Sequence, residues 1–163
     1  MTGVEDYSGF EVIRAAMEVE KNGHRFYRSM VDKVRSEVTR EVFSWLAQDE
    51  VQHLRTLEGI MPLFGQGAFW EDEDQFLPYL RRFADERIFP DPERLEGLIG
   101  DGDPDLQALD LAIEAEEKFA AFFQLAARQA RNNDGRQAFA WLASEEERHA
   151  AILKERKEKL LSL

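Results

Sequence analysis

The stretch FSWLAQDEVQH, residues 43–53, recurs as FAWLASEEERH at residues 139–149. The same 96-residue offset (53 to 149) relates AMEVE at residues 16–20 to AIEAE at residues 112–116. Two motifs that recur in the same order and at one offset are the signature of an internal repeat. The chain is therefore predicted to be a tandem duplication, with repeats at about residues 8–60 and 104–160.

Each repeat is predicted to form a helical hairpin. Its apolar residues recur every three or four positions, which is the period of one helix face. Turn signals lie near residues 34–37 in the first repeat and near residues 131–135, which include Asn-Asn-Asp-Gly, in the second. Because short connections place neighbouring helices antiparallel, two such hairpins make an all-α four-helix bundle.

The two repeats are joined by a segment at about residues 61–103 that is too long for a hairpin loop and is interrupted by prolines. It is predicted to contain a helix at about residues 71–88, and a short helix after Asp91-Pro92, where aspartate and proline suit the first positions. We expect the segment to be a crossover connection that carries the chain back to the other end of the bundle. Asp103, before Pro104, is predicted to cap the third long helix.

The composition limits the classes of function. The chain has 163 residues, 44% of them hydrophobic, which suits one well-packed domain spanning residues 1–163. The net charge of −12 argues against a protein that binds nucleic acid or an anionic membrane. No signal peptide and no membrane-spanning apolar run are found, so a soluble, cytoplasmic protein is expected. Without cysteine, any metal must be bound by Glu, Asp or His.

Glutamates lie on the apolar faces of the first and third helices. Glu20 falls on the stripe that contains Ile13, Met17 and Tyr27, and Glu116 has the equivalent position in the second repeat. A carboxylate placed in a core is costly unless it meets a positive charge. These two glutamates therefore need a cationic partner.

The second and fourth helices carry Glu-x-x-His on their apolar faces. A spacing of three residues brings the carboxylate and the imidazole to one side of a helix, where both project toward one point. All four helices then contribute metal-binding side chains to the interior of the bundle. The candidate ligands are Glu20, Glu50, His53, Glu116, Glu146 and His149.

These motifs resemble those of the rubrerythrins, a branch of the ferritin-like di-iron carboxylate proteins. The family's pattern, A-x-x-x-E followed by an aromatic pair and then L-A-x-x-E-x-x-H, occurs in both repeats. The resemblance implies a ferritin-like bundle that binds two iron ions, with manganese or zinc as alternatives. It also implies that Glu50 and Glu146 bridge the two metals. The ends of the centre would be completed by Glu20 with His53 and by Glu116 with His149.

The chain departs from the family pattern at three points. Phe119 stands where rubrerythrins have a further glutamate, which implies a more symmetric centre without redox-linked ligand exchange. The chain has no cysteine and so no rubredoxin domain, which means that electrons must come from another protein. Phe123 replaces one of the family's paired hydroxyl-bearing residues, and leaves Tyr27 as the hydroxyl expected beside the ligands.

Other interpretations of these residues stay open. The glutamates could be surface residues preserved by the duplication, although all of them fall on apolar faces. His24 has no histidine counterpart in the second repeat, where the residue is Ala120, so it is either a core histidine or an alternative metal ligand. Glu114 and Glu117 are expected on a solvated face.

Two further features near the motifs are interpreted as structural. Trp45 and Trp141 lie off the ligand stripe, so we expect them to pack against the crossover segment or another subunit, away from the metals. Residues 101–105 resemble the start of a calcium loop but lack the later glycine and glutamate of such loops.

The expected function is that of a di-iron oxidoreductase, a rubrerythrin-like peroxidase or ferroxidase. It would reduce hydrogen peroxide or dioxygen while oxidising Fe(II), with electrons from an external donor protein. The alternative is a non-enzymatic protein that stores or delivers iron, because one fold can host both functions. A homodimer is expected, with no nucleic-acid or membrane partner.

Overall fold

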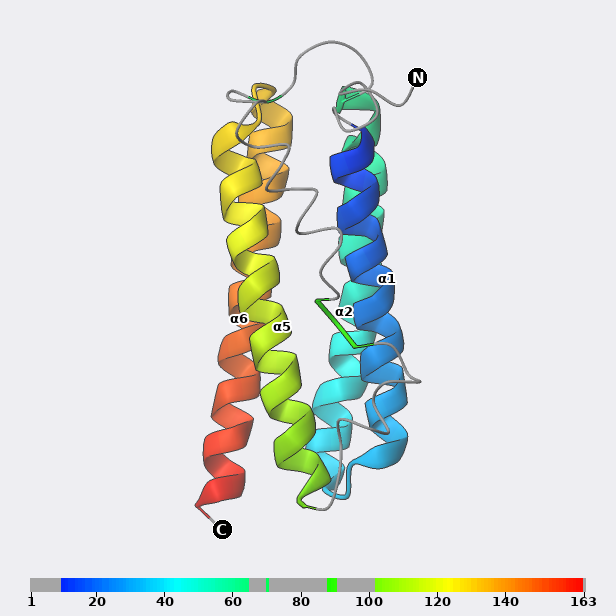
Figure 1. The fold of residues 1–163 in the computed structure, drawn as a ribbon, viewed down its shortest axis with the longest axis vertical. Coiled ribbons are helices and arrows are strands. Elements are labelled where there is room, and N and C mark those ends of the chain that lie inside the picture. Colours follow the sequence, from blue (N-terminus) through cyan, green and yellow to red (C-terminus); the bar gives the residue numbers. More distant parts are fainter. Residues whose placement is uncertain (1–9, 65–69, 71–87, 91–101, 163) are drawn as a thin grey trace.

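The computed structural model describes residues 10–64, 70, 88–90 and 102–162, and these residues form four long helices (Figure 1). The predicted all-α class is confirmed. The helices are α1 (Phe10–Lys33), α2 (Glu37–Ile60), α5 (Pro104–Gln129) and α6 (Asn133–Leu161), and a short 3₁₀ helix, η2 (Met61–Phe64), follows α2.

The four helices are arranged as two antiparallel hairpins. Figure 1 shows α1 beside α2 and α5 beside α6, with the two pairs packed along their length. The helix α2 ends at the end of the bundle where α1 begins, whereas α5 begins at the opposite end. A crossover connection between α2 and α5 follows from this arrangement, as predicted for a ferritin-like bundle.

The duplication is visible in the helix boundaries at both hairpin turns. The first helix of the hairpin ends at Lys33 in the first repeat and at Gln129 in the second, and the second helix begins at Glu37 and at Asn133. Both pairs of positions are 96 residues apart (33 to 129 and 37 to 133). Each second helix has a polar N-cap: the side chain of Ser36 accepts a hydrogen bond from the N–H of Thr39, and that of Asn132 accepts one from Gly135. Such caps satisfy backbone donors that have no partner within the helix.

Asp105 connects the two hairpins. Its side chain is 4% exposed and accepts hydrogen bonds from the backbone N–H groups of Arg35 (2.7 Å) and Ser36 (3.0 Å) in the turn between α1 and α2. Asp103 caps α5 as predicted, since its carboxylate accepts from the N–H groups of Asp105 and Leu106. The start of α5 is therefore fixed both to its own cap and to the first hairpin.

Aromatic side chains fill the core in two matching sets. Tyr27 stacks on Phe43 with ring centroids 5.6 Å apart, and the repeat equivalents Phe123 and Phe139 stack at 6.1 Å. The helices α1 and α5 are thus related in their packing as well as in their sequence.

The two sets differ in where one ring comes from. In the second repeat Phe119 lies against Phe123, with centroids 4.4 Å apart. The equivalent residue in the first repeat is Gly23, and there Phe89 of the connecting segment lies against Tyr27, at 5.7 Å. A Cβ atom at Gly23 would be 3.0 Å from the Phe89 ring, so any larger residue there would require this ring to shift. The connection therefore supplies a ring that α1 lacks.

The helix predicted at about residues 71–88 and the short helix predicted after Asp91-Pro92 lie outside the residues that the structure describes. Within the described ranges, no helix combines the length and the apolar character needed to cross a membrane.

Candidate metal centre

The six candidate ligands meet inside the bundle. Glu20 is 1% exposed and the other five residues are fully buried. Glu50, His53, Glu146 and His149 each offer a ligand atom, and these atoms all lie within 4.8 Å of one another. Because α2 and α6 each present the carboxylate and the imidazole of one Glu-x-x-His motif, the two hairpins share one cluster.

The two histidines direct the same ring nitrogen into the cluster. The Nδ1 atom of His53 lies 2.7 Å from a carboxylate oxygen of Glu146 and 3.5 Å from one of Glu20. The Nδ1 atom of His149 lies 3.3 Å from an oxygen of Glu116 and 3.5 Å from one of Glu50. Each imidazole therefore faces carboxylates from both hairpins.

The outer nitrogens of the histidines face a second pair of carboxylates, which the sequence analysis did not identify. The Nε2 atom of His149 lies 2.6 Å from Asp49, and that of His53 lies 3.7 Å from Glu145. Arg148 contacts both carboxylates, at 3.4 Å and 3.0 Å. A carboxylate on the outer nitrogen fixes the tautomer and orientation of a metal-binding histidine. The signal was present in the sequence, since Asp49 and Glu145 directly precede the two Glu-x-x-His motifs at the repeat offset.

The two exposed tryptophans lie closer to the cluster than expected. The ring of Trp45 packs edge-on against His149, and that of Trp141 against His53, each with centroids 5.7 Å apart. The expected packing against the crossover segment or another subunit therefore missed these contacts with the histidines. Both rings remain partly exposed, at 38% and 46%, so they separate the histidines from solvent on the α2–α6 face.

The carboxylates of the cluster repel one another in the absence of a cation. Burial, followed by the charges of Glu50 and Glu146, raises the pKa of Glu20 well above its ordinary value. Burial and the charges of Glu146 and Glu50 likewise raise the pKa of Glu116. Of the described residues, none hydrogen-bonds to either oxygen of Glu20 or Glu50. Buried carboxylate oxygens without donors are unusual and indicate a missing positive partner.

The histidines respond to the same charges. Burial lowers the pKa of His149, but Asp49 and the facing glutamates raise it by more, so the net shift is upward. The pKa of His53 is also raised overall, because Glu146 and Glu50 outweigh the effect of burial. In the metal-free protein the cluster therefore retains protons, which a bound cation would displace.

Comparison with known proteins agrees with the cluster. The family model for rubrerythrin matches residues 11–157, which include all six candidate ligands. The chain belongs to the rubrerythrin family. A solved structure of a hypothetical protein from Pyrococcus furiosus has the same fold, with a TM-score of 0.67 and 21% sequence identity over 97% of this chain and 93% of that chain. A comparison with curated proteins finds no match.

In this rubrerythrin-family chain, Tyr27 contacts one end of the cluster directly. Its hydroxyl donates a 2.6 Å hydrogen bond to Glu116. Burial and the charge of Glu116 raise the pKa of Tyr27, so the phenol keeps its proton and remains a donor. The repeat equivalent, Phe123, has no hydroxyl to offer Glu20. The predicted position of Tyr27 beside the ligands is thus observed, and it serves one end only.

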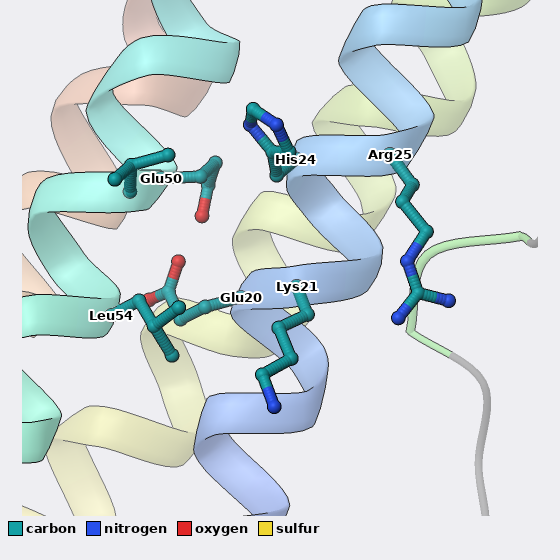
Figure 2. Close-up of a pocket in the computed structure, with 7 residues that line it drawn as sticks. Glu20, Lys21, His24, Arg25, Glu50 and Leu54 are labelled. Carbon is teal, nitrogen blue, oxygen red and sulfur yellow. The ribbon is translucent and has the colours of Figure 1, made fainter.

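His24 lies at the other end of the cluster. A pocket of about 150 Å³ between α1 and α2 is lined by Glu20, Lys21, His24, Arg25, Glu50, Val51 and Leu54. The Nδ1 atom of His24 lies 2.8 Å from the backbone oxygen of Ala47. Because a carbonyl oxygen only accepts, Nδ1 carries the proton and donates this hydrogen bond, and Nε2 is the other nitrogen of the ring. Figure 2 shows His24 reaching from α1 toward α2, beside the carboxylates of Glu20 and Glu50.

The remaining acidic residues near the motifs lie on the surface, as expected. Glu114 forms an ion pair with Lys118 at 3.2 Å, and Glu117 forms one with Lys154 at 3.2 Å. The position of the family's additional glutamate is taken by Phe119, which is fully buried. No carboxylate is therefore available at that position to exchange with a histidine.

The donor set fits a pair of transition-metal ions. Four buried carboxylates and two imidazoles offer oxygen and nitrogen atoms of the kind that iron, manganese and zinc bind in proteins. The oxygens of Glu20 and Glu50 lack, among the described residues, the donors that a purely structural cluster would require. A buried glutamate and histidine cluster compatible with di-iron binding is thus present.

Proposed function

We propose that this protein is a di-iron oxidoreductase that reduces hydrogen peroxide or dioxygen and takes its electrons from an external donor protein. The observation that carries the proposal is the convergence of four buried glutamates and two histidines, in which neither oxygen of Glu20 or Glu50 has a hydrogen-bond partner among the described residues. Two iron(II) ions in such a centre would supply one electron each, and these two electrons with two protons convert one peroxide molecule into two waters.

The chain's own residues would hold the two metals in a defined geometry. As the resemblance implies, Glu50 and Glu146 would bridge them, and each of these carboxylates lies within 4.0 Å of both histidines. Glu20 with His53, and Glu116 with His149, would complete the two ends. Asp49 and Glu145 would keep the outer nitrogens of the histidines oriented, and so keep Nδ1 directed at the metals.

The protein around the centre would restrict water and protons. The ligands are buried among aromatic rings, which lowers the effective dielectric constant and strengthens the attraction between carboxylates and metal ions. The Tyr27 hydroxyl, which donates a hydrogen bond to Glu116, would hold that carboxylate in place at its end of the centre. A peroxidase of this kind needs both protons and a limited supply of water.

The second candidate function is iron storage or delivery without turnover. The observation in its favour is the loss of the family's additional glutamate to Phe119, because the resemblance links that residue to rapid reaction with peroxide. The two functions make different demands on the protein. An enzyme must be re-reduced quickly by a partner, whereas a storage protein must retain more iron than its centre holds.

An anaerobic Fe(II) titration followed by stopped-flow mixing with hydrogen peroxide tests the proposal. We expect saturation at two Fe(II) per chain, then oxidation of both ions by one peroxide, with repeated turnover when a reductant is supplied. Stable retention of more than two irons per chain, without turnover, would favour storage. A chain that binds no iron would contradict both functions.

A further inference from the structure

The pocket between α1 and α2 reaches two of the candidate ligands. Its walls include Glu20 and Glu50, which are buried, together with Lys21, His24, Val51 and Leu54, which are partly exposed. Figure 2 shows the carboxylates of Glu20 and Glu50 facing one another across this pocket, while Lys21 and Arg25 extend away from them. The pocket thus joins the outer side of the α1–α2 hairpin to the Glu20 end of the centre.

The charges around the pocket favour a small anion or a polar oxidant. The chain as a whole has a net charge of −12, yet the α1 side chains that line the pocket, other than Glu20, are Lys21, His24 and Arg25. With metal bound, the charges of Glu20 and Glu50 would be balanced. Lys21, which pairs with Glu18 at 3.4 Å, and Arg25 then remain as the positively charged side chains of the lining.

The volume of the pocket limits the size of the ligand. A cavity of about 150 Å³ is of the size that holds one benzene-sized molecule. Hydrogen peroxide or a three-atom anion fits this space together with water, whereas a hydroperoxide with an aromatic substituent would fill it completely. The apolar side chains of Val51 and Leu54 form the α2 wall.

The corresponding surface of the second hairpin has different side chains. Lys21, His24 and Arg25 correspond to Glu117, Ala120 and Ala121. Two polar contacts cross between α5 and α6 there, from Lys154 to Glu117 and from Gln124 to Glu147. The Glu116 end therefore has acidic and small residues at these positions, and polar contacts link its two helices. The Glu20 end instead has a pocket lined by basic residues.

We propose that this pocket is the route by which a small oxidant reaches the centre, so that peroxide or a small anion binds to the metal at the Glu20 end. The inference rests on the proposed function, since it requires bound metal. It names an access route and a size limit for the oxidant, and it makes the two metals chemically inequivalent.

Azide binding to the oxidised, iron-loaded protein tests the route without turnover. Val51→Trp places a large ring in the α2 wall of the pocket, and Glu147→Trp makes the same change at the equivalent, exposed position of α6. Iron content and melting temperature are measured first for the wild type and both variants. Azide affinity is then measured from the absorption change on titration.

We expect Val51→Trp to weaken azide binding by about tenfold or more, and Glu147→Trp to change it by less than about twofold. Equal effects in the two variants, or full azide affinity in iron-loaded Val51→Trp, would overturn the route. If Val51→Trp does not load with iron, Leu54→Phe is the smaller change in the same wall and is judged by the same comparison. An iron-free wild type would instead overturn the proposed function, and the metal analysis detects that outcome separately.

A second arm addresses the substrate class. The rate at which the reduced centre is oxidised is compared for hydrogen peroxide and cumene hydroperoxide. We expect a much faster reaction with hydrogen peroxide, and we expect Val51→Trp to slow that reaction while Glu147→Trp does not. Equal rates for the two oxidants in the wild type would contradict the size limit set by the pocket.

Discussion

The two ends of the candidate centre are related by the repeat, but their surroundings differ. Glu116 accepts a 2.6 Å hydrogen bond from Tyr27, and its helix places Phe119 in the core. No described residue hydrogen-bonds to Glu20, whose helix has Gly23 and His24 beside a pocket. The duplication has therefore kept the ligands and changed their neighbours. Any inequivalence of the two metals must come from these neighbours.

The two repeats also differ in which segment of the chain supplies one aromatic ring of the core. Phe119 packs on Phe123 within α5, whereas the connecting segment supplies Phe89 to pack on Tyr27. In the first repeat the space needed for that ring is provided by Gly23. The core of the second half also takes rings from outside its own hairpin, since Phe64 and Trp70 pack on Phe139 with ring centroids 5.7 Å and 5.8 Å away.

The largest expected effect is on metal binding, and it comes from substitutions of the two glutamates that would contact both metals. Glu50→Ala and Glu146→Ala should each lose both metal ions, because each of these carboxylates would bridge the pair. Glu20→Ala or Glu116→Ala should weaken one ion and leave the other bound. Metal analysis after dialysis separates the two patterns. If Glu50→Ala or Glu146→Ala keeps two tightly bound ions, the bridging assignment is wrong.

The next effect is the pH dependence of the metal-free protein. The pKa values of Glu20 and Glu116 are raised in the folded state, so the folded chain holds protons that the unfolded chain has released. The raised pKa values of His53 and His149 act in the same direction. The free energy of unfolding should therefore fall as the pH rises from about 5 to about 8.

Calorimetric melting of the metal-free protein across that range measures this slope. Glu20→Gln should reduce the slope more than Glu116→Gln, because the Tyr27 hydroxyl stabilises the ionised form of Glu116 alone. A melting temperature that rises over this pH range would show that these glutamates are ionised and solvated.

A smaller effect is expected from the tyrosine that distinguishes the ends. Tyr27→Phe removes the donor to Glu116 and should lower the free energy of unfolding by about 1–3 kcal/mol, the usual cost of leaving a buried polar group unpaired. The matched change, Phe123→Tyr, adds a hydroxyl at the equivalent position near the Glu20 end. Denaturant unfolding of both variants tests whether the repeat symmetry extends to this contact, and a stable Tyr27→Phe variant would show that the contact contributes little.

The smallest effect is expected on the rate of reaction with peroxide. Phe119→Glu restores the carboxylate that the family has at this position, and should accelerate oxidation of the reduced centre by several-fold if a shifting ligand is what the chain lacks. His24→Ala tests the histidine that lines the pocket. An unchanged rate in a folded, iron-loaded Phe119→Glu variant would show that this position does not limit the reaction, and a large loss in His24→Ala would make His24 a functional residue.

Much of the fold could be predicted from the sequence because the repeated residues include apolar helix faces, buried glutamates and helix caps, each of which indicates a definite local structure. The 96-residue offset, from residue 53 to residue 149, located both hairpins. The glutamates on apolar faces located the cluster. The cap at Asp103 was also readable, since aspartate before proline suits a helix start.

The contacts between the hairpins could not be predicted in this way. Asp49 faces the histidine of the other hairpin, and Asp105 reaches the turn before α2. Such contacts depend on how the two units are packed together, which helical periodicity within one unit does not encode. The packing of Trp45 on His149 was missed for the same reason, because its position off the ligand stripe of α2 says nothing about α6.

Calorimetric titration of the metal-free protein with Fe(II), under anaerobic conditions and in buffers of different ionisation enthalpy, tests the central claim most directly. The account predicts two ions bound per chain, with protons released because the buried glutamates and histidines give up the protons that they hold without metal. It also predicts that the melting temperature rises as the ions bind. Binding of fewer than two ions, or binding without proton release, would show that these six residues do not form a two-metal centre.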